Sequence, residues 1–407
     1  MYRNGCNAGP LQPKSFKRVE RGLHVYWRTA LIPVNEPLLE EEDFVALQDT
    51  FRTGWISSAG KYVEEFEDSW SKYCGVRHGI GVSNGTTALQ VAVEAVGIGP
   101  GDEVIMPTFT IISCASAIIR AGGVPVLVDS DPMDWCMNVA QVEARITPRT
   151  KAIMVVHMYG HPVDMDPIMA LATKHGLTVI EDAAEVHGAQ YLSERNGTVP
   201  VWKKCGGIGH IATFSFFANK LITTGEGGMV ITDNDAFAAK ARGLRNLCFR
   251  QDRRFLHTEH GYQFRLTNMQ AALGVGQVRR IEKIVDRKRW AAAEYTRRLK
   301  DLPQLHLPME HDWAKSVYWI YGMVLSDDVP FDATEFAARL KKLNVETRPF
   351  FMGMHEQPVF HDMNLFRGES HPVSERIARR GLYVPSGLAL TLEQIEQVST
   401  AVHQALA

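Results

Sequence analysis

A single lysine, Lys220, lies between an apolar run and a glycine-rich turn in the stretch FSFFANKLITTGEGG, residues 214–228. A lysine in such a place can be a solvated surface charge, a ligand for phosphate or, once deprotonated, a nucleophile towards carbonyl groups. The three glycines that follow it favour a tight turn or a close approach of the backbone to another group. The local sequence leaves these roles open, so the choice depends on what the fold brings to Lys220.

The segment VSNGTTAL, residues 82–89, predicts a helix start that can bind an anion. The free amides of Gly85, Thr86 and Thr87 would combine with the helix dipole, and the hydroxyls of Ser83 and Thr86 would add donors. The alternative is a helix cap without a ligand. The segment is neither a Walker loop nor a GxGxxG turn, so it does not support classical nucleotide binding or an oxidoreductase of that type.

The segment LTVIEDAAEVHGA, residues 177–189, predicts a buried strand that ends on two acids, Glu181 and Asp182. Ligands of open α/β sheets bind beyond the carboxyl ends of the strands. An aspartate there can pair with a cationic ring nitrogen, hold a metal, or cap a helix. A metal would need further ligands, and only Glu185 and His187 are available nearby, so we expect none.

A lysine, an anion-binding helix start and an acid at the strand ends together predict a site for pyridoxal 5'-phosphate. The phosphate would bind at the helix start, Asp182 would keep the pyridine nitrogen protonated, and Lys220 would form the Schiff base. Once displaced by a substrate amine, Lys220 would become the base that moves a proton between Cα and C4′.

The elements that must position these residues follow a strand–helix–strand pattern over about the first 275 residues. Short apolar runs predict buried strands, and runs with helical spacing predict helices between them. The predicted strands are residues 103–107, 124–129, 152–160, 177–184 and 227–232, and the clearest helices are 86–97 and 163–176. The pattern predicts an α/β fold with a mostly parallel central sheet and helices on both faces.

The remaining chain predicts a smaller C-terminal domain. A long helix over residues 266–302 leads into it, followed by a strand at 317–325 and a helix at 332–345. The segment TRPFF and a last helix, TLEQIEQVSTAVHQAL, complete an α+β unit. We therefore expect an N-terminal extension at 1–30, a large α/β domain at 31–275 and a small domain at 276–407.

The bulk composition is that of a cytoplasmic enzyme. The 407 residues carry a formal net charge of −2, so no basic field favours nucleic acid. The six cysteines show no CxxC spacing and are expected to be reduced thiols. No window reaches the roughly 18 apolar residues that a membrane span requires.

The ordered motifs SNGTTAL, GDEVIMPTFT, VHMYGHPVDM, VIEDAAEVHGA, TFSFFANKLITTGEGGMV, RLTNMQAALG, YWIYGM and ETRPFF resemble the DegT/DnrJ/EryC1/StrS family of nucleotide-sugar aminotransferases. The resemblance begins near residue 31 and extends almost to the C-terminus. It implies fold type I of the pyridoxal-phosphate enzymes, a homodimer with shared active sites, and a ping-pong transfer of an amino group from L-glutamate to a keto sugar.

The family's motifs also imply roles for individual residues. Lys220 stands at the position of the lysine bound to the cofactor, Asp182 at that of the partner of the pyridine nitrogen, and Glu185 near the phenolic oxygen. The residues that the resemblance assigns to the phosphate are Gly85, Thr86 and Ser215. Relatives that act as dehydratases have histidine in place of the lysine, so Lys220 argues against dehydration.

Two positions depart from the family's usual pattern. Relatives have an aromatic residue that stacks on the cofactor ring where this chain has Ile111, which can pack on the ring without a π-stack. Relatives read GYNYRMTN, with an asparagine that reaches the neighbouring subunit's phosphate. This chain reads GYQFRLTN, in which Gln263 offers the same amide on a longer arm.

The run SFFANKLITTGEGGMV resembles most the family members that convert GDP-4-keto-6-deoxymannose to GDP-perosamine for surface glycans, such as lipopolysaccharide O-antigen. The alternatives are another keto sugar, such as an 8-keto octulosonate or a UDP-linked 4-keto sugar, or a dehydratase or regulatory protein of the same fold. A regulatory protein would be expected to lack Lys220 or Asp182, and both are present.

Three further residues are candidates for contact with the substrate: His187, Arg348 and His355. Each also has a structural interpretation, as a hydrogen-bonded core histidine or a salt-bridged arginine. Trp55 would line the wall on the dimer side or belong to the core, and Arg265 would lie near the dimer interface.

Overall fold

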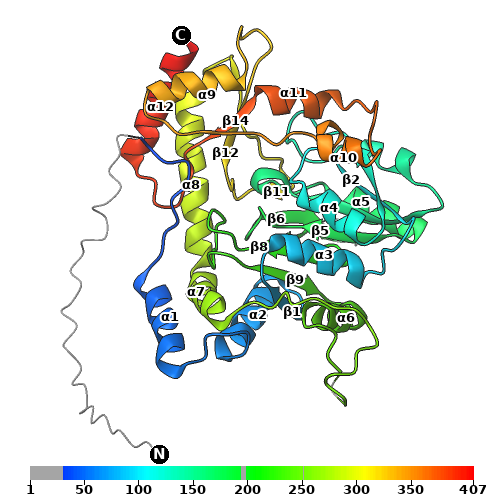
Figure 1. Cartoon of the computed structure of the whole chain (residues 1–407). Coiled ribbons are helices and arrows are strands. Elements are labelled where there is room, and N and C mark those ends of the chain that lie inside the picture. Colours follow the sequence, from blue (N-terminus) through cyan, green and yellow to red (C-terminus); the bar gives the residue numbers. More distant parts are fainter. Residues whose placement is uncertain (1–30, 194–198, 251) are drawn as a thin grey trace, which may run out of the picture.

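The computed structural model describes residues 31–193, 199–250 and 252–407, so the predicted extension at 1–30 lies outside the described residues. A seven-stranded sheet forms the centre, in the order β1-β9-β8-β5-β4-β2-β3 (Figure 1). Its strands are β1 (His78–Val82), β2 (Glu103–Pro107), β3 (Val124–Val128), β4 (Thr150–Val156), β5 (Thr178–Asp182), β8 (Ile211–Ser215) and β9 (Gly228–Thr232).

All neighbouring pairs in this sheet are parallel except the two that β9 makes with β1 and β8. Because β9 runs against both of its neighbours, β1 points the same way as β8. The carboxyl ends of β1, β5 and β8 therefore meet at one edge of the sheet. The segments that follow these ends carry the chemistry predicted above.

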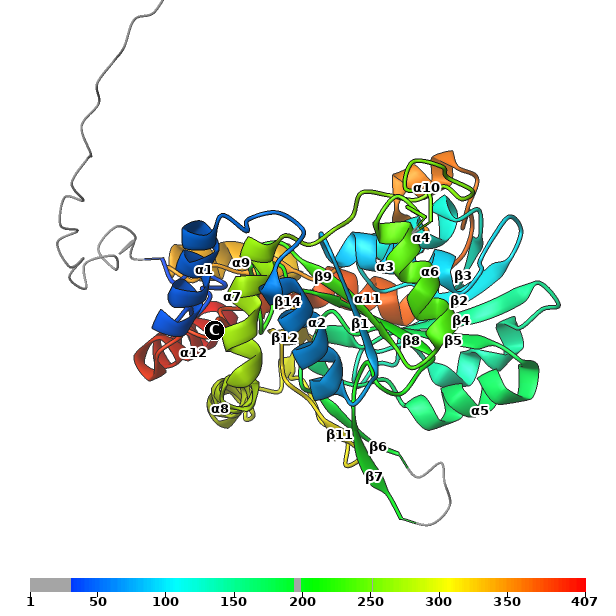
Figure 2. The ribbon, with the colours of Figure 1, turned by 90° about the horizontal axis from the view of Figure 1, so that it is seen from below.

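Helices cover both faces of the sheet, as expected when buried strands have no polar alternation. Helices α3, α4 and α6 pack on one face, and α5 lies on the other beside β4 and β5 (Figure 2). The helices that precede residue 246 are α1 (Glu41–Thr53), α2 (Lys61–Cys74), α3 (Gly85–Ala95), α4 (Ser113–Arg120), α5 (Met165–His175) and α6 (Asp235–Arg245). None of the helices in the described ranges has the length and apolar character needed to cross a bilayer.

The C-terminal part contains a second, antiparallel sheet in the order β10-β12-β14-β13. Its strands are β10 (Leu305–His306), β12 (Tyr321–Leu325), β13 (Arg348–Pro349) and β14 (Gly381–Val384). Its helices are α9 (Ala333–Lys342), α10 (Pro358–Asp362), α11 (Pro372–Arg380) and α12 (Leu392–Leu406). A third small sheet projects from the body and consists of β6 (Gln190–Ser193), β7 (Val201–Lys204) and β11 (Ala314–Lys315).

Two helices, α7 (Asn268–Arg279) and α8 (Ile281–Leu299), connect the two main parts. The sequence predicted one helix over 266–302. The structure breaks it at Arg280, whose φ of −110° and ψ of 17° interrupt the helical hydrogen bonds. Apolar residues of α8 up to Val285 pack in the core of the large sheet, and those from Ala291 onward pack in a second core.

Other expected elements differ at their ends. The run 152–160 leaves the strand after Val156 and turns through a 3-10 segment, Met158–Gly160, in which Tyr159 has a φ of +54°. The strand expected at 317–325 begins only at Tyr321. Val156 and Trp319, at these two ends, line the cavity described next.

Candidate active site

A cavity of about 650 Å³ opens at the edge of the sheet where β1, β5 and β8 end. Its wall includes the start of α3, the end of β5 and the connection between β8 and β9, which carries Lys220. Trp319, Phe351 and Tyr383 from the C-terminal part complete the wall. Residues far apart in the sequence therefore meet in one site.

The start of α3 is held close to the end of β8. Asn84 caps the helix by accepting the amide of Thr87 at 2.9 Å. The Thr87 amide, which was predicted to bind an anion, is therefore occupied by the cap. The first-turn amides of Gly85 and Thr86 remain free to bind one. A Cβ atom on Gly85 would lie 2.7 Å from Cβ of Ser215, so this close approach requires glycine.

The amides of Gly85 and Thr86 and the hydroxyls of Thr86 and Ser215 form a cup at the cavity wall. A further hydroxyl, which the sequence analysis did not identify, extends this cup. The Oγ atom of Ser113, at the start of α4, lies 2.8 Å from Oγ1 of Thr86. Ser113 lines the cavity together with Gly85, Thr86 and Ser215. A serine at the start of a second helix was the only sequence signal for it.

Asp182 lies at the end of β5 and is buried. One carboxylate oxygen accepts the amide of Ala184 at 3.1 Å, and the other accepts the thiol of Cys114 at 3.1 Å. Burial raises the pKa of Asp182 above its ordinary value, against the lowering effects of these two bonds. A buried carboxylate with so few donors suits a cationic partner in the cavity.

Lys220 lies in the cavity wall, and its side chain is 9% exposed. Its Nζ atom lies 3.5 Å from Oε1 of Glu185 and 3.5 Å from the centre of the Trp319 ring. Burial lowers the pKa of this amine, while Glu185 and Asp182 act in the opposite direction. Removal from water therefore favours the uncharged, nucleophilic form of the lysine.

Glu185 links this lysine to the turn after β4. Its Oε2 atom accepts the amide of Tyr159 at 2.9 Å, and its Oε1 atom faces Lys220. Burial raises the pKa of Glu185 to about 7 despite the nearby ammonium. The site thus pairs an amine whose pKa is lowered with a carboxyl whose pKa is raised, as in many centres of proton transfer.

The residues in the cavity fit pyridoxal phosphate. The cup of amides and hydroxyls at the start of α3 can hold a phosphate, Asp182 can face a ring nitrogen, and Lys220 can reach an aldehyde. Ile111 also lines the cavity and is partly exposed, as a residue covering one face of a ring would be.

The structure does not bring His187 or His355 to the cavity. His187 is fully buried and stacks on Phe216, with Trp70 against its edge. His355 is held between Oγ1 of Thr108 at 2.7 Å and a carboxylate at 3.2 Å. The geometry therefore does not support a substrate contact for either histidine, because neither lines the cavity and each is held by other partners.

The other predicted residues lie around the site. Arg348 pairs across the small sheet with Tyr383, which lines the cavity, and forms an ion pair with Glu346 at 2.7 Å. Gln263 is exposed and pairs with Asn246 outside the cavity wall. Two residues expected towards the dimer side are Arg265, which donates to Asn246, and Trp55, which is exposed.

A mostly parallel sheet with this lysine, carboxylate and anion cup at one edge defines a pyridoxal-phosphate enzyme of fold type I. The chain matches the family model described as the DegT/DnrJ/EryC1/StrS aminotransferase family over residues 37–403. It therefore belongs to this family, and it is a pyridoxal-phosphate-dependent sugar aminotransferase.

Individual relatives cover nearly the whole chain. A protein named GDP-perosamine synthase from Caulobacter vibrioides is 40% identical, over 92% of this chain and 98% of its own. One of the same name from Escherichia coli O157:H7 is 37% identical over the same shares of both chains. The crystal structure of S. venezuelae DesV with a ketimine intermediate has a TM-score of 0.82 and 32% identity, and the match covers 91% of this chain and 98% of DesV.

Proposed function

We propose that this enzyme transfers the amino group of L-glutamate to GDP-4-keto-6-deoxymannose and so forms GDP-perosamine. The observation that carries the transamination is the buried Lys220, which faces Glu185 in a cavity that also contains Asp182. The choice of sugar is supported by the relatives named GDP-perosamine synthase, which this chain resembles over 98% of their length.

Pyridoxal phosphate, when bound, supplies an aldehyde that condenses with amines and a ring that accepts the electron pair of a cleaved Cα–H bond. We assign the proton movement to Nζ of Lys220, which would take the proton from Cα of the donor and deliver it to C4′ of the cofactor. Burial of Lys220 favours the uncharged amine that this role requires.

Asp182 would hold a ring nitrogen in its protonated form. The Cys114 thiol and the Ala184 amide orient this carboxylate, and burial raises the pKa of Cys114, so the thiol remains a hydrogen-bond donor. Glu185 would exchange a proton with the groups around Lys220, since its pKa of about 7 allows both forms near neutral pH.

The cup of Gly85, Thr86 and Ser215 would bind the phosphate and orient the cofactor. Ile111 would pack on one ring face, and the indole of Trp319 would cover Lys220 and keep water away from its amine. Arg348, beside Tyr383 at the small sheet, would meet the anionic part of the sugar nucleotide.

The test is a panel of keto sugars incubated with glutamate or glutamine and followed by mass spectrometry. We expect GDP-4-keto-6-deoxymannose to gain an amino group with glutamate as the donor. Amination of an 8-keto octulosonate or a UDP-4-keto sugar instead would reject the proposed sugar and keep the transamination. Loss of a hydroxyl without amination would support a dehydratase, and a colourless protein that takes up no pyridoxal phosphate would support a regulatory role.

We also propose a homodimer with shared active sites. The buried residues of α1 are Asp43 and Thr50, whereas Phe44, Val45 and Phe51 on the same helix are exposed. An apolar face of this kind suits an interface, and the exposed Trp55 and Ile56 extend it.

In the proposed dimer, Gln263 of one copy would reach the phosphate bound by the other copy, because this side chain lies outside the cavity of its own chain. The free state of the five cysteines in the described ranges supports a cytoplasmic location, where thiols are kept reduced. The sugar product would then serve surface glycans.

A further inference from the structure

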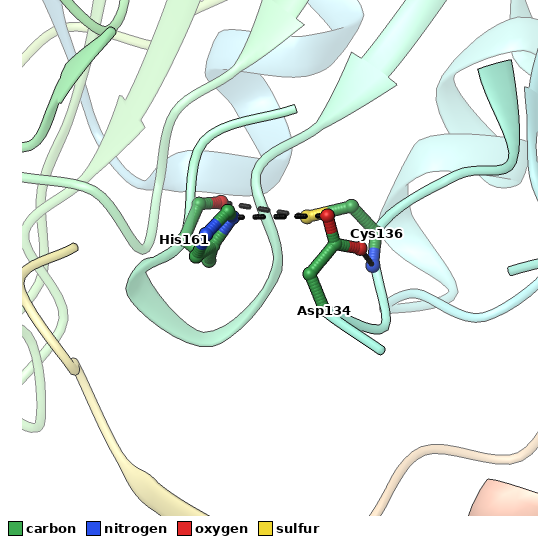
Figure 3. A group of neighbouring side chains, drawn as sticks. All are labelled: Asp134, Cys136 and His161. Atoms are coloured by element: carbon green, nitrogen blue, oxygen red, sulfur yellow. Dashed lines mark hydrogen bonds and ion pairs between the residues drawn. The ribbon is translucent and has the colours of Figure 1, made fainter. Parts of the chain in front are cut away.

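Three side chains with metal-binding chemistry converge away from the active-site cavity. Asp134 and Cys136 follow β3, and His161 follows the turn after β4 (Figure 3). One oxygen of Asp134, Sγ of Cys136 and one ring nitrogen of His161 lie within 4.8 Å of one another. Cys136 and His161 are buried, and the Asp134 side chain is 9% exposed.

The local backbone turns these groups towards one another. Oδ1 of Asp134 accepts the amide of Cys136 at 2.9 Å, and this bond closes a turn over Trp135. Trp135 has a φ of +65°, a conformation that is strained for a bulky residue, and its ring is held by Tyr159 and Phe350. Strain maintained by packing is a feature of functional sites.

A fourth donor approaches from the segment before β11. Nε2 of His311 lies 3.4 Å from Oδ2 of Asp134, and Nδ1 of His161 lies 4.0 Å from the same oxygen. The His311 ring stacks on Trp313, with ring centres 4.7 Å apart. The ion pairs of Asp134 within the described ranges are with these two imidazoles, so no lysine or arginine there neutralises the carboxylate.

We propose that Asp134, Cys136, His161 and His311 bind one zinc ion. A thiolate, a carboxylate and two neutral imidazoles are each established types of zinc ligand, four of them complete a tetrahedron, and the two anionic ligands balance the charge of the ion. Zinc ligands of these types lie about 3.3–3.6 Å apart when the usual bond lengths are combined in a tetrahedron. The donor atoms of Asp134, Cys136 and His161 lie within 4.8 Å of one another, so they would have to close by about 1 Å around the ion, and His311 would turn in from its contact with Asp134.

The protons balance in this arrangement. The thiol of Cys136, whose hydrogen-bond contacts with the carbonyls of His161 and Pro162 are long at 3.5 and 3.8 Å, gives its proton to solvent as the sulfur–zinc bond forms. Nδ1 of His161 lies 2.7 Å from the carbonyl oxygen of Pro162. Nε2 accepts the backbone amide of His311 at 3.4 Å, and this nitrogen would exchange that long bond for the ion while Nδ1–H keeps its bond to Pro162.

A bound ion would connect the segment after β3, the turn after β4 and the entry to β11. His161 lies two residues after Tyr159, whose amide donates to Glu185. The zinc is therefore structural: it braces the turn that orients a carboxyl of the active site and does not touch the substrate cavity.

The experiment measures zinc in tag-free protein by mass spectrometry after dialysis, and affinity by competition with a chelator. We expect about one zinc per chain, and a Co²⁺-substituted protein with the charge-transfer absorption of a thiolate ligand. Cys136→Ser and His311→Gln should each weaken the affinity at least about tenfold, since even outer-shell partners are worth 10–100-fold. Cys74→Ser, at another buried free cysteine, is the matched control and should retain the zinc.

His311 is about one-third exposed, so the His311→Gln protein is expected to fold even if Cys136→Ser does not. The proposal is overturned if the wild-type protein holds no more zinc than His311→Gln, or if the cobalt protein lacks the thiolate band. It is also overturned if added zinc raises the unfolding temperature of wild type no more than it raises that of His311→Gln, since a ligand of the native state must stabilise that state.

Discussion

Two side chains at the centre of the cavity have pKa values shifted by burial in directions that suit proton transfer. Lys220 becomes a weaker base and Glu185 a weaker acid, because both charged forms lose hydration in the cavity wall. The 3.5 Å separation of Nζ and Oε1 leaves room for a proton to be exchanged as reacting groups enter. The role of each residue is therefore open to direct tests.

Replacing Lys220 by alanine removes the amine that is proposed to bind the cofactor and to carry the proton. We expect kcat to fall at least about 10²-fold, the lower end of general base effects, and the absorption of the bound cofactor to shift towards that of the free aldehyde. Stopped assays and absorption spectra measure both changes. Lys174→Ala, at an exposed lysine paired with Glu143, is the control and should leave both unchanged.

Glu185→Gln tests the elevated pKa in cofactor-free protein. Glu185 stays protonated in the fold up to a pKa of about 7, whereas the unfolded chain ionises near 4.5. Wild type therefore loses stability as the pH rises from about 5 to 7, and the glutamine variant does not. The difference of about 2.5 pKa units corresponds to roughly 3 kcal/mol at pH 8.

Denaturant unfolding of both proteins at pH 5 and pH 8 measures this effect. The two should be similar at pH 5, and Glu185→Gln should be the more stable at pH 8. Glu64→Gln, at an exposed glutamate of α2, is the matched control. An equal difference at both pH values would contradict the elevated pKa.

The contact between α3 and β8 shows how whole elements position these residues. Gly85 faces Ser215, and Gly228 passes so close to Asn84 that a Cβ there would meet its carbonyl. Both glycines are needed because the strand end and the helix start share one narrow space. The phosphate cup thus depends on backbone distances between elements as well as on the identity of its donors.

Gly85→Ala tests this dependence. The added Cβ, 2.7 Å from that of Ser215, must push the helix start away from β8. We expect a loss of stability of about 1–3 kcal/mol, typical of overpacking, and weaker binding of pyridoxal phosphate in an equilibrium titration. Gly99→Ala is the control, because its Cβ would meet only one atom, 3.9 Å away. Unchanged cofactor affinity in Gly85→Ala would contradict the proposed phosphate cup.

Within the described part of the chain, α8 joins two hydrophobic cores, and helix α1 has an apolar exposed face. Helix α1 packs on α7 (Figure 1), and Arg280 forms an ion pair with the buried Asp43 that holds it there. This anchor uses the polar side of α1 and turns Phe44 and Phe51 outward. A second copy of the chain would cover them.

The double substitution Phe44→Glu and Phe51→Glu should separate the proposed homodimer. Two charges on an apolar interface would lose hydration without a partner, so the dimer should dissociate. Light scattering during size-exclusion chromatography would show a mass near that of one chain. Val359→Glu, at an exposed valine of α10, is the control. A wild-type protein with the mass of one chain would reject the dimer itself.

Much of the fold and the central groups of the site could be predicted from residue order. Runs such as VPVLV and EVIMP predict buried strands because apolar β-branched residues without alternation suit a covered sheet. The predicted bounds of β2 agree with the structure, and those of β3 differ by one residue. The predicted mostly parallel sheet is confirmed, and so is the family that the motifs around Asp182 and Lys220 indicate.

Long-range contacts were beyond such prediction, because side chains meet through packing between segments that the sequence separates. The break at Arg280, the indole of Trp319 over Lys220 and the core position of His187 all depend on these contacts. The same holds for Cys136 and His161, which no local spacing connects. Local patterns thus specify the elements and the reactive groups at their ends, whereas the distances that turn those groups into sites arise only when the elements pack.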